Sequence, residues 1–392
     1  MTAVSDQERV ERAARQVVAE HDPRSTPREE FLGACFDAGL SWVHFPVGLG
    51  GLGVSRGLQK AADRILQEAG GPEPFSINPM GYGMAAPTIL EHGSPELCER
   101  LLRPLATTEH IWCQMFSEPG AGSDLAGLAT MAVRDGDDWI VTGQKVWTSK
   151  AHEARWGLLL ARSDPDAPKH RGLTYFVVDM HAPGVDVRPL RQITGAAEFN
   201  EVHLNGVRVP DGDRLGEVGN GWKVAMTTLM NERVAIGDGS SARDSGSIRD
   251  ALDLWARRPD LHTPVQRDRL AGLWIEAEAQ RLNRARARVA ASTGSPGPEG
   301  TIAKLAGAEL NQRVYEYCIE LLGAEGTLYG SYDSPGPDVG GPLQQRFLRS
   351  RANTIEGGTS EVLRNVLAER VLGLPGEPRT DTGRPWREVP RG

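Results

Sequence analysis

The chain has 392 residues, of which 39% are hydrophobic and 6% aromatic, and its formal net charge is -8. This length exceeds what one hydrophobic core usually supports, so we expect two or three packed domains, and the apolar content excludes global disorder. The negative charge argues against a nucleic-acid partner, because such binding needs cations that neutralise phosphates.

Neither a secretory signal nor a membrane span is expected. The first residues, MTAVSDQERVERAARQ, are polar and charged, and the longest apolar runs, such as residues 156–161, are far too short to span a bilayer. The cysteines, Cys35, Cys98, Cys113 and Cys318, are widely separated and form no metal-binding pattern. We therefore predict a cytoplasmic chain with reduced, buried thiols, no metal site and no membrane partner.

Residues 1–113 show the pattern of a helical domain. Leu97, Leu101, Leu102 and Leu105 recur at helical spacing. Ser94-Pro95 directly precedes them, and a Ser cap followed by Pro at the first helical position is a strong helix start. The Gly-rich stretches 47–54 and 70–83 are predicted to be loops between helices.

Residues 114–215 show a different pattern, typical of a compact antiparallel β domain. Short runs at 139–141, 156–160 and 173–178 are rich in β-branched and aromatic residues. Turn residues separate them at 135–138, at 163–168 and at Asn205-Gly206. No βαβ alternation is present, which argues against a doubly wound nucleotide-binding fold.

Helical periodicity returns in residues 216–375. Apolar residues from Ile302 to Leu321 and from Val362 to Val371 are spaced as on helices, and the second set ends at Gly373. Residues 293–300 and 331–342 are predicted to be loops. Residues 376–392 form a polar tail that we expect to be mobile or to lie on a neighbouring molecule.

Two segments of the β region have residues suited to binding chemistry. Residues 117–124, SEPGAGSD, contain two glycines that can turn backbone N–H groups toward one point and so form an anion-binding nest, with the Ser123 hydroxyl as a further donor. Residues 143–149, GQKVWTS, place Trp147 where an indole can pack on a flat redox ring. Each segment has a plainer interpretation, an ordinary turn and a core tryptophan on a strand.

Together, EPGAGSD and GQKVWTS, separated by about twenty residues, resemble the acyl-CoA dehydrogenase family. The resemblance continues through LLARSD at 159–164, GNGW at 219–222 and SEVLRNVLAERVLGLP at 360–375, and so covers about residues 5–375. It implies an α+β, mostly α fold. The expected domains are an N-terminal helical domain (1–113), a middle antiparallel β domain (114–215) and a C-terminal four-helix bundle (216–375), with a tail (376–392).

The resemblance also implies an FAD cofactor, an acyl-CoA substrate and a set of contacts. Residues expected to contact FAD are Gln114, Met115, Phe116, Ser117, Gly122, Ser123, Trp147, Thr148, Ser149, Thr359 and Glu361. Of these, Ser117 is expected at the pyrimidine side of the flavin and Ser149 near N5. Residues expected to contact the thioester are Ser123, Met230, Asn231, Arg233 and Gly358.

The catalytic base is where this sequence departs from many relatives. They carry a Glu directly before Gly-Thr ahead of the last helix, where this chain has Gly357, and Glu356 falls one residue early. A minority of the family instead place the Glu on a bundle helix just before an Arg, and Glu232-Arg233 matches that arrangement. We predict Glu232 as the base, with Glu356 as the alternative and Arg233 in a supporting role.

A second departure concerns the adenine end of FAD. The Arg-x-x-Phe-Gly segment of many relatives is absent from residues 257–269, and Glu320 replaces the usual Gln. The family implies an electron-transfer flavoprotein as acceptor and a homotetramer or dimer, and the departures keep a hetero-oligomer with shared sites as an alternative. The sequence is also compatible with a flavin monooxygenase or oxidase on the same fold, and with an acyl-carrier-protein thioester as substrate.

Overall fold

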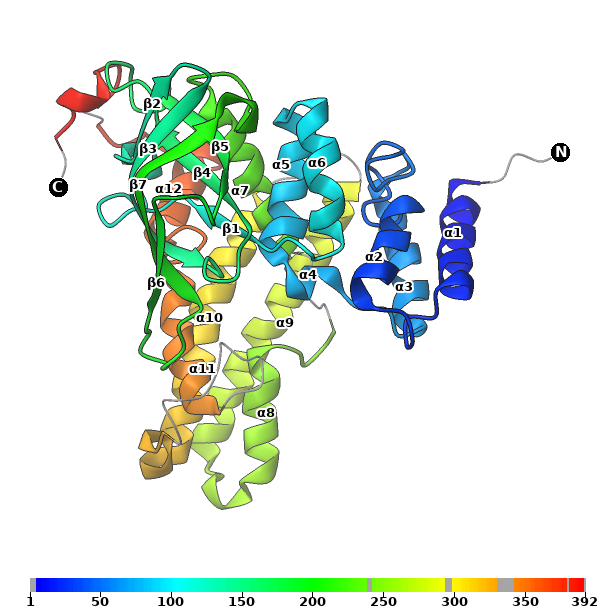
Figure 1. The fold of residues 1–392 in the computed structure, drawn as a ribbon. Helices are drawn as coiled ribbons and strands as arrows, with labels where there is room; N and C mark the ends of the chain where they lie inside the picture. The colour runs from blue at the N-terminus through cyan, green and yellow to red at the C-terminus, as the bar shows by residue number, and fades with distance from the viewer. Residues whose placement is uncertain (1–4, 238–241, 293–297, 330–341, 379–380, 391–392) are drawn as a thin grey trace. The chain divides into compact units, whose positions relative to one another are not determined.

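The computed structural model describes residues 5–237, 242–292, 298–329, 342–378 and 381–390 (Figure 1). The chain forms two compact units. The first comprises Met1–Pro189, Phe199–Glu232 and Asp381–Gly392, and the second comprises Leu190–Glu198 and Arg233–Thr380. The predicted mixture of helices with an antiparallel-rich sheet is confirmed.

The first unit begins with helices. These are α1 (Asp6–Glu20), α2 (Arg28–Asp37), α3 (Gln59–Glu68), α4 (Pro74–Ile77), the π-helix η2 (Gly81–Ala85), α5 (Ala86–His92) and α6 (Pro95–Ala106). The predicted start of α6 is confirmed, because the Ser94 hydroxyl accepts a hydrogen bond from Leu97 N. The predicted cap therefore fixes the helix that packs against the sheet.

The prediction of a loop over residues 70–83 was wrong, because this stretch contains α4 and the start of η2. The reason is Asn78, whose side chain is completely buried. Its amide nitrogen donates to the carbonyl oxygens of Leu105 and His110, and its oxygen accepts from Gly81 N and Trp112 N. One satisfied polar side chain thereby joins the π-helix to the first strand.

The sheet has eight strands. They are β1 (Trp112–Met115), β2 (Met131–Asp135), β3 (Asp138–Ser149), β4 (Trp156–Arg162), β5 (Leu173–Asp179), β6 (Val185–Leu190), β7 (Phe199–Pro210) and β8 (Arg214–Leu215). Their order is β6-β7-β3-β2-β4-β5-β8, and β1 pairs with β4. The β1–β4 and β2–β4 pairs are parallel, and the β2–β3, β3–β7, β4–β5 and β5–β8 pairs are antiparallel.

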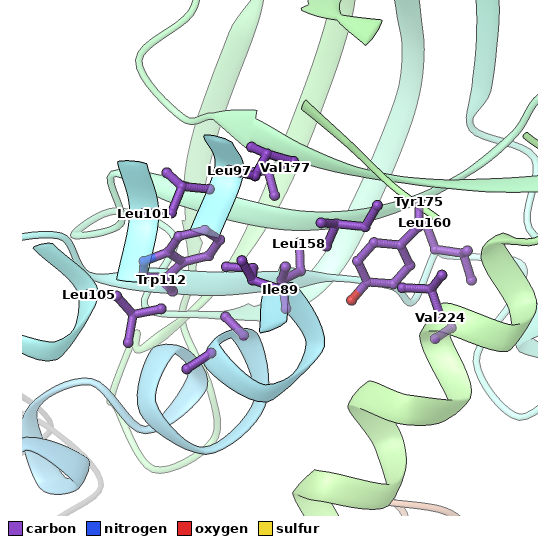
Figure 2. Close-up of a cluster of buried hydrophobic side chains, with 14 of the residues drawn as sticks. Ile89, Leu97, Leu101, Leu105, Trp112, Leu158, Leu160, Tyr175, Val177 and Val224 are labelled. Carbon is purple, nitrogen blue, oxygen red and sulfur yellow. The ribbon is translucent and has the colours of Figure 1, made fainter. Parts of the chain in front are cut away.

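Both faces of the central strands are buried, which explains their continuous apolar runs. Alternate residues of β4 and β5 belong to different cores: Leu158 and Tyr175 pack toward α5, α6 and α7, whereas Leu159 and Phe176 pack on the opposite face. Figure 2 shows the first of these cores, with Tyr175 beside Val224 of α7 (Gly221–Gly237). The helical segments thus fix the sheet on which the candidate site lies.

The predicted turn at Asn205-Gly206 is instead part of a β-bulge inside β7. The pairs Val141–Val207 and Thr142–Asn205 leave Gly206 as the extra residue, and its φ of 66° lies in the left-handed region. A glycine at this point satisfies a bulge as readily as a hairpin turn, so the local sequence alone could not distinguish the two.

The second unit is helical. Its main elements are α8 (Ser247–Arg257), α9 (Pro264–Ser292), α10 (Glu299–Leu322), α11 (Leu343–Ser350) and α12 (Ser360–Arg370). Helix α10 packs against α8, α9, α11 and α12. Of the two predicted loops here, residues 293–297 of the first and 331–341 of the second lie outside the described residues, and Glu299-Gly300 belongs to α10 rather than to a loop.

The tail prediction was also wrong for the described residues 381–390. Rather than being mobile or lying on a neighbouring molecule, they pack on the chain's own β domain, where Trp386 is only 7% exposed. A single aromatic side chain anchors a segment that is otherwise poor in apolar residues.

Candidate functional site

A buried ion pair joins the two sequence motifs. Lys145 Nζ lies 2.8 Å from Glu118 Oε1 and also donates to Phe116 O at 3.0 Å. The Lys145 side chain is completely buried and that of Glu118 is 8% exposed. Neither residue is among the predicted site residues, because the sequence alone does not show that the two motifs meet here.

Two backbone amides add hydrogen bonds to both oxygens of Glu118. Its carboxylate accepts from the backbone N–H groups of Ala129 and Thr130, at 2.6 and 2.9 Å. Burial alone would raise the pKa of Glu118, but the Lys145 ammonium and these hydrogen bonds outweigh it and hold that pKa below its usual range. A paired, fully hydrogen-bonded charge of this kind positions backbone but costs a great deal if one partner is lost.

Trp147 lies at a second β-bulge, directly after this pair. The pairs Lys145–Val202 and Thr148–Asn200 leave Val146 and Trp147 opposite one residue, Glu201. Val146 N donates to Ser117 O at 2.9 Å, which closes the bulge onto the end of β1. The φ of Trp147 is 60°, a left-handed conformation that costs a bulky residue about 1–3 kcal/mol.

The bulge turns the Trp147 side chain outward, so the interpretation as a core tryptophan is wrong. The residue is 58% exposed, and its ring meets Phe199 edge-on with 5.9 Å between centroids. A strained backbone that presents a large exposed indole is unfavourable for folding alone. This combination fits a site where a flat cofactor covers the ring.

The SEPGAGSD segment forms a closed turn, and its anion-binding role stays a prediction. Glu118 and Ala121 exchange backbone hydrogen bonds of 3.0 Å in both directions. Neither Gly120 nor Gly122 has a positive φ, so this turn does not use the left-handed conformation that favours glycine. A Cβ added to either glycine would meet nothing within 4 Å, so the fold itself does not need them. Their lack of a side chain suits close approach by a ligand instead.

The other predicted flavin contacts differ in how the structure presents them. Gln114, Ser117 and Ser149 are half-buried, Phe116 is buried at the rim of the first core, and Gly122 and Ser123 are exposed. The side chains of Met115 and Thr148 are completely buried. These two residues therefore lie behind the exposed surface of the site, and their contact with a cofactor stays a prediction.

Helix α7 carries the predicted base and is fixed to the sheet by hydroxyl groups. The Tyr175 and Thr228 hydroxyls lie 2.9 Å apart, and Thr228 lies 3.0 Å from the Thr88 hydroxyl. Tyr175 also meets Phe116 edge-on, with 5.7 Å between centroids. Contacts through Thr228, Tyr175 and Phe116 thus connect α7 with the segment that carries the predicted flavin contacts Phe116 and Ser117.

The start of α7 explains the second glycine of GNGW, Gly221. A Cβ on Gly221 would lie 2.7 Å from backbone atoms of Thr174, so only glycine allows this approach to β5. Further along the helix, Met230 is 61% exposed and Asn231 donates to Thr227 O. Glu232 and Arg233 lie in α7, but their side chains are outside the described residues.

The alternative base, Glu356, lies in the second unit and is engaged by neighbouring groups. Its two carboxylate oxygens receive the Arg349 guanidinium at 3.1 and 2.9 Å, and Asn353 Nδ2 donates to one of them at 2.8 Å. Gly357 and Gly358 follow with positive φ values of 61° and 96°. The carboxylate is therefore held in a bidentate pair, in a segment whose backbone turns sharply after it.

The loop around Glu356 is tied to α10, and α12 starts directly after it. Lys304 Nζ donates to the carbonyl oxygens of Asn353 and Gly358, at 2.8 and 2.6 Å. The Thr359 hydroxyl accepts from Val362 N and so caps α12, while Glu361 is exposed in its first turn. Thr359 and Glu361 thus lie at the predicted helix start.

Near the expected adenine end of FAD, the residues at which this chain departs from its relatives form ion pairs within the second unit. Arg258 pairs with Asp260 and Glu325, and Arg269 pairs with Glu320 at 2.6 Å. The His262 ring stacks on Trp255 with 3.7 Å between centroids. These side chains replace the Arg-x-x-Phe-Gly segment with a local network of their own.

All four cysteines are free and buried, as predicted. In the part of the chain that the structure describes, no helix is both long and apolar enough to cross a membrane. Within those same residues, no group of His, Cys, Asp and Glu is arranged to hold a metal ion.

Family models match nearly the whole chain. The models are the N-terminal, middle and C-terminal domains of acyl-CoA dehydrogenase, over residues 5–109, 113–207 and 219–372. The chain is 44% identical to acyl-CoA dehydrogenase FadE34 of Mycobacterium tuberculosis over 89% of its own length, but spans only 47% of that protein. It is 36% identical to acyl-CoA dehydrogenase IpdE1 of the same organism, covering 87% of this chain and 86% of IpdE1.

Solved structures agree. The Tcur3481-Tcur3483 steroid ACAD has a TM-score of 0.73 at 30% identity, covering 95% of this chain and 94% of the other. The ChsE4-ChsE5 complex from Mycobacterium tuberculosis has a TM-score of 0.71 at 30% identity, covering 96% and 100%. Fold and matches together define an oxidoreductase that acts on acyl-CoA. The chain belongs to the acyl-CoA dehydrogenase family, which implies FAD as its cofactor.

Proposed function

We propose that this chain removes the α and β hydrogens of an acyl-CoA thioester to give the trans-2-enoyl-CoA. The observation that carries the proposal is the exposed Trp147 on its strained bulge, next to the turn with exposed Gly122 and Ser123 and held near it by the Glu118–Lys145 pair. This arrangement suits a flat cofactor on the indole and a phosphate or thioester group passing Ser123.

FAD, when bound, would supply the hydride acceptor for the hydrogen of the β-carbon. The chain's own residues supply the rest of the chemistry. We assign Phe116, Ser117, Trp147 and Ser149 to the flavin ring, and Gln114, Met115 and Thr148 to the cofactor-binding segments around it. Gly122 and Ser123 are assigned to the pyrophosphate and the passing thioester, and Thr359 and Glu361 to contacts from the start of α12.

Glu232 is assigned as the base that takes the α-proton, with Arg233 supporting it electrostatically. The α-proton is weakly acidic, so the carboxylate must be available and its proton affinity raised by desolvation when substrate binds. Glu356 is less suited, because Arg349 and Asn353 already occupy its oxygens. Met230, Asn231 and Gly358 are assigned to the thioester side.

The substrate class is proposed from a structural relative. A protein described as a steroid ACAD shares 30% identity with this chain over nearly its full length. We therefore propose a bulky, cyclic acyl thioester as the first class to test, carried by CoA, with an electron-transfer flavoprotein as electron acceptor. A homotetramer or dimer in the cytoplasm is the proposed form.

A second candidate is an FAD-binding subunit that needs a different partner chain. The ChsE4-ChsE5 structure is a complex of two differently named proteins. In this chain, Arg258 and Arg269 pair with Glu325 and Glu320 of the same unit, in the region where the Arg-x-x-Phe-Gly segment is absent. This candidate predicts weak FAD retention by the purified chain and no flavin reduction until a partner is added.

The test is anaerobic flavin bleaching with the purified full chain. FAD content is measured first, and acyl-CoAs with straight, branched and steroid-like acyl groups are then added. Full FAD occupancy with bleaching by at least one thioester supports the enzyme. Bleaching only after a partner chain is added supports the second candidate, and FAD binding without bleaching by any thioester in either form contradicts both.

A further inference from the structure

The C-terminal tail makes a continuous set of contacts with the β domain. This segment, residues 381–390, is red in Figure 1. Trp386 N donates to Ala167 O at 3.0 Å, Arg387 N donates to Pro165 O at 3.1 Å, and Pro385 forms a β-bridge with Pro168. The tail thereby lies along the loop that connects β4 with β5.

The Trp386 side chain reaches beyond that loop to the segment after SEPGAGSD. Its indole Nε1 donates to Gly127 O at 3.1 Å. Its ring lies over the Arg162 guanidinium, with 4.5 Å between Arg162 Cζ and the ring centroid. Gly127 ends the 3-10 turn η3 (Leu125–Gly127), which follows Ser123 and Asp124 directly. One tail side chain therefore contacts the turn that continues from the proposed phosphate segment.

The Arg162 guanidinium donates hydrogen bonds to the same turn. Its side chain is completely buried, and it donates to Ala126 O at 2.6 Å, to Leu128 O at 3.4 Å and to Lys169 O at 2.9 Å. The carbonyl groups of three consecutive residues, 126, 127 and 128, are thus each bonded by Arg162 or by Trp386. Such a turn has little freedom while the indole covers the guanidinium.

Lys169 makes a second link between the tail and this segment. Its ammonium donates to both carboxylate oxygens of Asp124, at 2.9 and 3.0 Å, and pairs with the carboxylate of Asp381. The Lys169 side chain is 10% exposed and that of Asp381 15%, so solvent screens this pair less than a surface pair. Asp124 follows Ser123 directly, so the ammonium fixes the residue next to the proposed ligand contact.

We propose that the tail is a brace that holds residues 123–128 in the conformation that binds FAD and the thioester, with Trp386, Asp381 and Lys169 as positioning residues. The ligand-binding role of this segment rests on the proposed function. The brace itself rests on the contacts above. A loop that is already ordered loses less conformational entropy when a ligand binds, so removing the brace weakens binding without removing any group that touches the ligand.

The test uses the full chain and the variants Trp386→Ala, Trp386→Phe and Asp381→Asn. Arg387→Ala is the matched control, because the Arg387 guanidinium pairs with Asp166 at the surface, where the two side chains are 62% and 59% exposed. Amide hydrogen exchange is followed for residues 123–130 without FAD, and FAD affinity is measured by titration. Trp386→Phe keeps an aromatic ring on Arg162 but removes the donor to Gly127 O.

We expect exchange at residues 127–130 to accelerate roughly tenfold in Trp386→Ala, less in Trp386→Phe and Asp381→Asn, and not in Arg387→Ala. FAD affinity should fall in the same order, by roughly tenfold in Trp386→Ala. Unchanged exchange at 127–130 in Trp386→Ala, with faster exchange at 386–389, overturns the brace. Failure of the wild-type chain to bind FAD, both alone and with a partner chain, overturns the proposed function, while the exchange data still decide on the brace.

Discussion

The two carboxylates Glu118 and Glu356 show how differently the chain fixes its two candidate site segments. Glu118 pairs with a completely buried Lys145 and with two backbone amides inside the β domain. Glu356 pairs with Arg349 at the surface of the helical unit, where the two side chains are 39% and 29% exposed. Losing one partner of a buried pair leaves an uncompensated charge, so such a pair constrains the local backbone strongly. A surface pair contributes little to stability and mainly keeps the carboxylate hydrogen-bonded.

The largest effect is expected from breaking the buried pair. Lys145→Met leaves the Glu118 carboxylate buried without its cation, and should lower the free energy of unfolding by about 3–5 kcal/mol. Lys150→Met is the control, because Lys150 is 34% exposed and pairs with Glu153 at 3.2 Å, a contact worth about 0–1 kcal/mol. Denaturant unfolding of both variants measures the difference, and equal losses would show that the buried pair does not organise this segment.

The buried pair should also appear in the acid dependence of stability. The pKa of Glu118 in the folded chain is below its ordinary value of 4.5. Its stabilising contribution is therefore complete above about pH 4.5 and is lost as the pH falls through the lower folded-state pKa. Glu118→Gln should reduce stability at pH 7 and remove this part of the acid loss. A variant whose free energy of unfolding falls with acid as steeply as that of the wild type contradicts the assignment.

A smaller effect is expected at the surface pair. Arg349→Gln removes the bidentate contact to Glu356 but leaves Asn353 as a hydrogen-bond donor. The free energy of unfolding should change by no more than about 1 kcal/mol. Thermal unfolding measures this change. A loss in free energy of unfolding similar to that of Lys145→Met would contradict the proposed difference between the two carboxylate pairs.

The smallest stability effect is expected at the residue most closely tied to the cofactor. Trp147→Gly relieves a left-handed φ but adds freedom to the unfolded chain, so these effects largely cancel and stability should stay within about 1 kcal/mol of wild type. FAD affinity should nevertheless fall, because the exposed indole is lost. Titration with FAD alongside denaturant unfolding separates the two, and a large loss of stability with unchanged FAD affinity would make Trp147 a structural residue.

Much of the fold followed from local patterns in the sequence. The Ser94 cap and the leucine spacing predicted α6, and the β-branched runs predicted β4 and β5, because one face or both faces of these elements are buried. The bulge at Gly206 and the π-helix after Asn78 were missed, since each depends on a partner far away in the chain.

The site was predictable in part for the same reason. Trp147 and Ser117 are predicted from a motif, but the Glu118–Lys145 pair spans 27 residues and is visible only once the fold brings these two segments together. The tail looked mobile because its composition is polar. Its one tryptophan was the available signal, since an aromatic residue in a polar segment often marks an anchor.

The proposal that Glu232 rather than Glu356 takes the α-proton is tested most directly by anaerobic flavin reduction in the two Gln variants. We expect Glu232→Gln to keep FAD bound but to slow bleaching by an active acyl-CoA at least about 10²-fold, while Glu356→Gln stays near the wild-type rate. Normal bleaching in Glu232→Gln together with its loss in Glu356→Gln would contradict the assignment of the base.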